Sequence, residues 1–401
     1  MKSSLAIPLL VLLCVANLAA AQDEPAPEPH IKTRASLMVI DDATTYSALH
    51  PALPAAITQL LTDPTVNLLQ NQVLVEPSLT LRYRERWSLS SSVVGVVQSN
   101  RGLAASEFDP PAGVPAVTAG LNAALDPYTG AHEFLRVKEV YGGLSAGDFD
   151  FTAGRRIVRW GTGYAFTPAG VLDPPRNPTN PTDRLNVNVG RDMIKADFVH
   201  GSQAVQLAWS STVLDKAQMN AHDTTALRYN VLLHGFDACA IAGDDRGGDA
   251  FGGVTFTRVL GQAWEVHGEV MWRDQAAAVL GAKYITGSGV TFIGEFYTQP
   301  NTPYYWSSAS PPLSARSQFV FFNVSKSRLR ELPGWKEWDL GAYMVANVRD
   351  HSFTAIFDAA RRFGNHFSAY LHLEAPQGSR TSEYGATPYT TATSLGVRFQ
   401  L

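Results

Sequence analysis

Three arginines lie within five residues of one another, at Arg155, Arg156 and Arg159, just before a proline-rich stretch. Guanidinium groups bind carboxylates and phosphates through paired hydrogen bonds, so such a cluster can attract an anionic or polyhydroxylated solute. Between positions 154 and 195, seven basic residues stand against three acidic ones. The basic residues are Arg155, Arg156, Arg159, Arg176, Arg184, Arg191 and Lys195, and the acidic ones are Asp173, Asp183 and Asp192.

Two interpretations of this segment follow from its residue types. In the first, residues 161–189 fold into a pore as a constriction, and the guanidiniums select the solute. In the second, the arginines pair with Glu139, Asp173, Asp183 and Asp192 and pin the segment to a wall. The two interpretations are compatible, because a segment pinned inside a pore still sets its width. The candidate constriction residues are therefore the seven basic residues together with Glu139 and Asp173.

Other chemistry has less support in the sequence. None of the ten histidines lies in a recognisable nucleophile motif, so no catalytic residues and no cofactor are predicted. Glu265, His267 and Glu269 alternate on one strand face and could offer a cation three ligands about 7 Å apart. No short Cys or His cluster accompanies them, and a metal site is not predicted.

The N-terminus predicts export from the cytoplasm. Lys2 precedes the apolar run 5–18 and three alanines, which is typical of a signal peptide (residues 1–21) cleaved after Ala21. Cleavage would remove Cys14 and leave Cys239 as the only cysteine of the mature chain, so no internal disulfide is expected. Residues 22–32 are acidic and proline-rich, as in a disordered linker.

Composition narrows the protein class further. The net charge of −4 is too mild to indicate a nucleic-acid partner. Only 17% of the residues are charged, yet no apolar run of about 18 follows the signal, so helical membrane spans are not predicted. A chain of this length suits either several soluble domains or one large barrel.

The stretch 264–272 shows the dominant pattern of the chain. Trp264, Val270 and Trp272 point to one face, and Glu265 and Glu269 to the other. Eight steps along a strand cover roughly 26 Å. At a tilt near 40° that is about 20 Å along a membrane normal, close to the separation of the two aromatic girdles of a membrane barrel.

The same alternation recurs in later strands and at the C-terminus, residues 391–401. No proline occurs between Pro181 and Pro300, as expected where every strand amide must pair with a neighbour. The pattern predicts an all-β transmembrane antiparallel barrel with a polar lumen. The predicted lumen-facing residues are Glu265, His267, Glu269, Glu295, His372 and Glu374.

A strand count follows from placing both termini on the periplasmic side, with tight turns inside and long loops outside. Counting back from Leu401 gives 16 strands, with 14 or 18 as alternatives, if residues 79–98 form one long strand. The count requires a short strand at 236–243, paired through the turn His234-Gly235. Residues 76–401 form the predicted barrel, and residues 33–75 are a periplasmic segment or a lumen plug.

Residues 133–178 carry a resemblance to known proteins. Glu139 and Tyr141, a tight turn, Gly154-Arg155, Trp160-Gly161 and Asp173-Pro174 follow one another as in porin-like families of Gram-negative outer-membrane barrels related to the alginate-export channels. Arg156 replaces a Gln that is frequent in those families, and Asp173 an Asn. The C-terminal strand resembles the one by which such barrels are recognised for assembly, with Leu401 in place of an aromatic.

The resemblance and the strand pattern together predict a passive outer-membrane channel for small polar or anionic solutes. An export pore for an acidic polysaccharide and a non-transporting surface or scaffold barrel are the alternatives. The expected partners are outer-membrane lipid and lipopolysaccharide, the barrel-assembly machinery and a small polar solute, with no nucleic acid.

Overall fold

The structure is a computed structural model of the chain. It describes residues 31–47, 68–101, 128–129, 133–174, 178, 188–210, 223–245, 250–273, 275–300, 316–329, 334–379, 382–385, 387 and 389–401. Within these ranges no helix is long and apolar enough to cross a membrane. The predicted signal peptide, residues 22–30 of the predicted linker, and Arg176, Arg184 and Asp183 lie outside the described residues. Residues 31–32, the end of the predicted linker, are instead the start of a strand.

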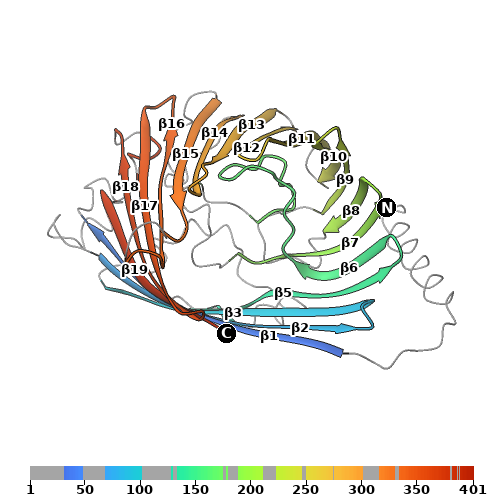
Figure 1. Cartoon of the computed structure of the whole chain (residues 1–401), viewed down its shortest axis with the longest axis horizontal. Coiled ribbons are helices and arrows are strands. Elements are labelled where there is room, and N and C mark those ends of the chain that lie inside the picture. The colour runs from blue at the N-terminus through green and yellow to red at the C-terminus, as the bar shows by residue number, and fades with distance from the viewer. Residues whose placement is uncertain are drawn as a thin grey trace.

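The described strands form one closed antiparallel ring (Figure 1). Each strand pairs with the next along the chain, and β1 pairs with β19 to close the ring. The two-residue strand β4 pairs only with β5, and β3 pairs directly with β5, so the wall contains 18 of the 19 strands. The strands are β1 Ile31–Ser47, β2 Leu68–Tyr83, β3 Trp87–Arg101, β4 Tyr128–Thr129, β5 Glu133–Ala146, β6 Phe149–Arg156, β7 Arg191–His200, β8 Gln203–Ser210, β9 Thr224–Leu233, β10 Phe236–Asp245, β11 Ala250–Leu260, β12 Trp264–Trp272, β13 Ala276–Ile285, β14 Val290–Pro300, β15 Arg316–Lys326, β16 Trp338–Asn347, β17 Ser352–Phe363, β18 Phe367–Gln377 and β19 Thr391–Gln400.

The strand count corrects the predicted 16 to 18. Residues 79–98 are not one strand, because β2 ends at Tyr83 and β3 begins at Trp87. The turn between them contains Arg84 and Glu85, both with positive φ (50° and 55°), and neither is a residue type that predicts such a turn. The second additional strand is β1, so residues 31–47 and 68–75 belong to the barrel wall and not to a plug or a separate segment. The predicted strand at 236–243 is confirmed as β10, paired with β9.

Connections at the two ends of the barrel differ in length, as the parity argument predicts. Tight turns join β5 to β6, β7 to β8 and β9 to β10, whereas 34 residues (157–190) separate β6 from β7. Gly147, Gly201 and Gly235 occupy left-handed positions in these tight turns, with φ of 60°, 59° and 79°, where a side chain would be strained. We call this end the short-turn edge.

The two faces of the wall differ as the alternation predicts. On β12, Trp264, Val270 and Trp272 are 49%, 45% and 58% exposed, whereas His267 and Glu269 are buried. A sheet that turns its apolar residues outward and buries polar ones inside inverts the usual soluble arrangement.

Candidate functional site

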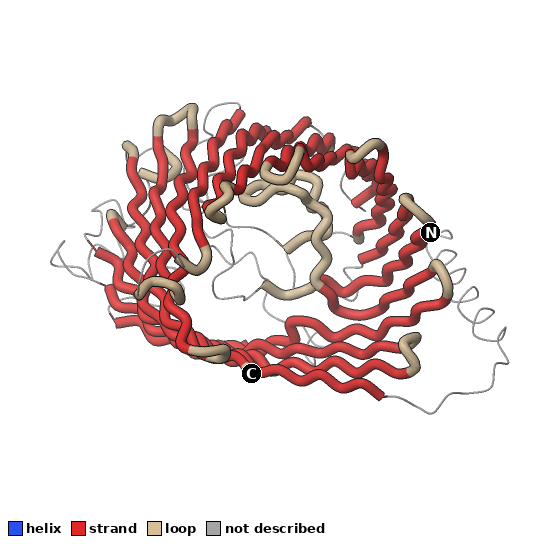
Figure 2. Tube along the Cα trace, viewed as in Figure 1, coloured by secondary structure: helices blue, strands red, loops and turns tan. Residues whose placement is uncertain are grey.

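The first part of the long β6–β7 connection, residues 157–174, lies inside the ring of strands (Figure 2). We call it the inner segment. It has no regular secondary structure, so its backbone amides need partners from elsewhere. Carboxylates supply them.

Glu269 of β12 is the first of these carboxylates. Its Oε1 accepts hydrogen bonds from the amides of Thr162 and Gly163, the latter at 2.7 Å, and from the Thr162 hydroxyl at 3.0 Å. Its Oε2 accepts the amide of Ala169 at 2.9 Å. One buried carboxylate therefore fixes the segment at two points seven residues apart, and charged acceptors make stronger bonds than neutral ones.

Glu295 of β14 repeats the arrangement one step further along the segment. Its Oε1 accepts the amide of Tyr164, and its Oε2 the amides of Ala165 at 2.9 Å and Phe166 at 3.4 Å. His267 of β12 lies 2.9 Å from the same carboxylate through Nε2, and both side chains are fully buried. Glu269 and Glu295 together bind six backbone amides.

Two glycines make this close approach possible. A Cβ on Gly163 would lie 1.9 Å from the carbonyl oxygen of Phe166 and 3.4 Å from Glu295 Oε1. A Cβ on Gly161 would lie 2.4 Å from Thr167 and 3.3 Å from Glu269 Oε1. The alternating glycines of the sequence Gly-Thr-Gly are therefore required by the tight turn at the carboxylates.

The start of the segment is held by Asp173 and Glu139. Asp173 accepts the amides of Trp160 at 2.6 Å and Gly161 at 3.3 Å, which closes the segment on itself. Glu139 accepts the amide of Ile157 at 2.8 Å. The register of β3 against β5 shifts beside Glu139, so Lys138 is an extra residue there. Such a bulge re-aims side chains, and the Lys138 carbonyl also accepts the amide of Gly190 at 2.9 Å, at the far end of the connection.

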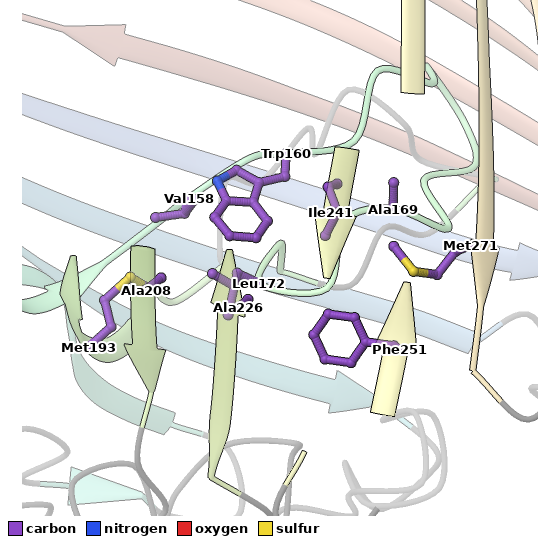
Figure 3. Packing of buried hydrophobic residues seen from close by; sticks show 10 residues of the cluster. All are labelled: Val158, Trp160, Ala169, Leu172, Met193, Ala208, Ala226, Ile241, Phe251 and Met271. Atoms are coloured by element: carbon purple, nitrogen blue, oxygen red, sulfur yellow. The ribbon is translucent and has the colours of Figure 1, made fainter. Parts of the chain in front are cut away.

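Apolar packing holds the other face of the segment against the wall. Val158, Trp160, Ala169 and Leu172 of the segment form one buried cluster with side chains of six strands (Figure 3). The partners from the wall are Met193, Ala208, Ala226, Ile241, Phe251 and Met271. Trp160 is 2% exposed, and burying a side chain of that size contributes about 1.5–3 kcal/mol or more.

The three clustered arginines have three different environments. Arg155 is fully buried and makes two hydrogen bonds to Asp192, at 2.9 and 3.1 Å. Arg156 donates to the Thr152 hydroxyl at 3.0 Å and lies over the ring of Tyr141 at 4.9 Å. Arg159 is exposed.

Arg155 and Arg159 do not share a strand face, although regular alternation over four positions would place them on one. Strand β6 ends at Arg156, and Gly154 has a φ of 127° that interrupts the alternation. Arg159 belongs to the inner segment, between Val158 and Trp160, which both pack against the wall. In an extended backbone its side chain therefore points away from that cluster.

The segment is fixed to the wall, but not by the predicted arginine–carboxylate pairs. The pair of Arg155 with Asp192 joins two neighbouring wall strands, β6 and β7, whereas Asp173 and Glu139 accept backbone amides of the segment. The sequence identified Glu269 and Glu295 only as lumen-facing residues, and their role as anchors was missed. The sequence feature that could have revealed this anchoring role is Gly161-Thr162-Gly163, because the two glycines have no side chains that could accept hydrogen bonds from the amides of the turn.

The remaining predicted residues make separate contacts. Arg191 donates to the carbonyl of Val171 at 3.0 Å, and Lys195 contacts Asp197. Glu265 accepts the hydroxyl of Tyr164 at 2.9 Å, and Lys283 donates to the same hydroxyl at 3.1 Å. On another part of the wall, His372 lies 2.6 Å from Asp358, and Glu374 accepts from Thr354 at 3.4 Å.

A second connection packs against the inner segment. Tyr384, between β18 and β19, shares a buried cluster with Ala165 and Phe166 of the segment. The neighbouring Glu383 accepts from Asn347 at 3.0 Å, and its amide donates to Asp350 at 2.7 Å. Burial raises the pKa of the Glu383 carboxyl from 4.5 to about 7, and the Asp350 charge adds to this increase while the Asn347 bond opposes it.

One sequence match to a catalytic motif has a structural explanation. The stretch Gly-Leu-Ser-Ala-Gly at 143–147 has the spacing of a nucleophile elbow. It forms the end of β5 and a tight turn, not a strand–helix elbow, and the Ser145 hydroxyl donates to Asp150. His200, which binds Asp148 at 2.8 Å, lies on the opposite face of the wall from Ser145 by strand alternation. The residues required for nucleophilic catalysis are therefore not assembled there.

Comparison with known proteins gives a match in structure only. No family model and no curated protein sequence matches the chain. OccK5 (OpdH) of Pseudomonas aeruginosa has a TM-score of 0.57 and 8% identity over 92% of this chain and 98% of that one. The outer-membrane protein OpdK of the same organism has a TM-score of 0.56 and 9% identity, with the same coverage. OpdK with vanillate has a TM-score of 0.55 and 9% identity. The chain therefore shares the barrel fold of these proteins.

Proposed function

We propose that the chain is an outer-membrane channel for the passive passage of small polar or anionic solutes, with the inner segment as its constriction. The observation that carries this proposal is the inner segment itself, held inside a closed 18-stranded ring by Glu269 and Glu295. A loop fixed inside a barrel narrows the passage without blocking it, which is the geometry of a size-selective pore.

The outer surface supports placement in a membrane. The outward residues of β12, β14 and β19 include Trp264, Phe296 and Leu395, which are 49%, 44% and 58% exposed. A surface with so many exposed apolar side chains is unfavourable in water and matches the lipid-facing surface of a barrel. Neighbours of the same fold include an outer-membrane protein. Export through a signal peptide cleaved after Ala21 and assembly through the C-terminal strand belong to the same proposal.

The solute class is argued from the charges that stay accessible. Carboxylates of Glu269 and Glu295 are buried under backbone amides, and Arg155 is neutralised by Asp192. Arg159 is the one basic residue of the inner segment and is exposed, so a small anion can reach its guanidinium. A structural neighbour has been solved with vanillate, a small solute of the size that such a pore would pass.

The pinned segment favours this function over the alternatives. A polysaccharide export pore needs a passage wide enough for a polymer, and a scaffold barrel needs no fixed segment in its lumen. No catalytic role is proposed, because Ser145 and His200 lie on opposite faces of the wall.

The test is single-channel conductance of the purified, folded chain in a planar bilayer. Discrete ion currents are expected, with a reversal potential that shows anion preference in a salt gradient. Arg159→Gln should reduce that preference, and Arg349→Gln, which removes an exposed charge from the β16–β17 turn, should not. A folded protein without current would refute the channel, and an unchanged reversal potential in Arg159→Gln would refute the role of this arginine.

A further inference from the structure

The outward face of the short-turn edge carries arginines stacked on aromatic rings. The Arg258 guanidinium lies 4.3 Å from the centre of the Phe236 ring, its cross-strand partner. Arg361 lies 4.9 Å from Phe363 and 5.8 Å from Trp338, its partner on β16. Both arginines are on the outward face, because they alternate in register with exposed apolar residues.

An outward arginine is unusual on a lipid-facing wall. It costs about 2–4 kcal/mol at mid-membrane and about 0–1 kcal/mol near the interface. Arg258 is two residues from the end of β11, and Arg361 two from the end of β17. Their position at the ends of the strands therefore places both guanidiniums at headgroup level, where the ring stack holds them in a fixed orientation.

Acidic residues do not balance these charges on the same face. We consider the three residues of each described wall strand that lie nearest this edge. Strand alternation turns every Asp and Glu side chain among them inward. Asp150, Asp237, Glu265 and Asp339 occur there but turn inward, and Asp339 pairs with Arg362 at 2.6 Å. By contrast, Asp244 is exposed on the outward face near the opposite edge. Among the strand-end residues of this edge, the outward charge is therefore positive.

We propose that the short-turn edge binds the phosphate groups of anionic glycerophospholipids through Arg258 and Arg361. The planar guanidinium can bind two phosphate oxygens at once while its other face remains on the ring. The inference rests on the proposed function for placement in a membrane. It adds a preferred lipid class and fixes which edge of the barrel faces that lipid.

Native mass spectrometry of the full-length folded barrel in detergent tests the proposal. The protein is titrated with phosphatidylglycerol and, separately, with phosphatidylcholine of the same chains. The wild type should bind the first two phosphatidylglycerol molecules more tightly than it binds phosphatidylcholine. Arg258→Gln and Arg361→Gln should each lower the affinity for one of these two molecules about fivefold. Arg349→Gln removes the same charge at the other end and is the matched control. Arg361→Lys, which keeps the charge without the planar stack, should give an intermediate loss.

The outcomes separate this proposal from the channel. Equal binding of the two lipids, or equal loss in Arg349→Gln and Arg361→Gln, overturns the lipid site even when the barrel conducts ions. Heat-modifiable migration on gels confirms that each variant is folded before titration. A wild-type barrel that folds and prefers phosphatidylglycerol but conducts no ions would refute the channel and leave the lipid site standing.

Discussion

Two parts of the inner wall use the same residue types in different ways. On β12 and β14, Glu269 and Glu295 accept the backbone amides of a crossing segment. On β17 and β18, Asp358 binds His372 at 2.6 Å and Glu374 accepts from Thr354. Strand alternation turns all of these polar side chains inward, but among them only Glu269 and Glu295 hold backbone amides of a crossing segment in the part of the chain that the structure describes.

The difference shows what fixes a segment inside a polar barrel. Asp358, which pairs with a neighbouring side chain and keeps 33% of its own side chain exposed, can exchange that partner for water or solute. A carboxylate that satisfies several buried amides cannot, because each amide left without a partner costs about 1–3 kcal/mol. The β12–β14 wall is therefore expected to be rigid and the β17–β18 wall to be available to a solute.

The largest expected effect comes from Glu269→Ala. The change leaves the amides of Thr162, Gly163 and Ala169 without their acceptor, at about 1.5–3 kcal/mol for each bond to a charged group. The inner segment should detach from the wall, so single-channel conductance should rise and the segment should become sensitive to protease.

The matched control for this variant is Glu374→Ala on the other wall, which removes a carboxylate that holds no backbone amide in the described structure. Its conductance should stay close to that of the wild type. Equal changes in the two variants would show that the walls do not differ in this respect.

Next in size is the effect of breaking the buried pair of Arg155 and Asp192. Arg155→Gln leaves a buried carboxylate without its partner, which costs about 3–5 kcal/mol. The temperature of the heat-modifiable gel shift should fall clearly. Arg159→Gln should not change it, because that side chain is exposed. A stable Arg155→Gln barrel would contradict the assignment of Arg155 as a structural residue.

A smaller effect is expected from the glycine turn. Gly163→Ala places a methyl group 1.9 Å from the carbonyl of Phe166, so the turn must shift at about 1–3 kcal/mol. Conductance noise should increase as the segment samples more than one position. Gly294→Ala on β14 is the control, because its added Cβ meets nothing within 4 Å. Quiet single-channel traces from Gly163→Ala would argue against a rigid turn.

The sequence predicted the wall much better than the segment inside it. Alternation reports which side chains share a face, so it identified β12, β14 and β19 and the inward position of Glu269 and Glu295. It missed the turn at Arg84 and Glu85, because non-glycine residues adopt positive φ there. It also missed the anchoring role of the carboxylates, since their partners are backbone amides at least 100 residues away, and a backbone amide has no signature in the sequence.

The smallest expected effect concerns the second contact of the inner segment, through Glu383 and Tyr384. The pKa of the Glu383 carboxyl is raised from 4.5 to about 7, so the folded loop binds a proton that the unfolded loop releases. Its packing is therefore strongest below about pH 4.5 and weakens as the pH rises toward 7. Two other titratable groups lie beside it. The Asp350 carboxylate accepts the Glu383 amide, and burial also raises the pKa of the Tyr384 hydroxyl.

Hydrogen exchange of the loop amides, corrected for intrinsic rates, should show less protection at pH 8 than at pH 5. Glu383→Gln should make the protection independent of pH over this range, and a pH dependence that persists in this variant would assign the effect to another group.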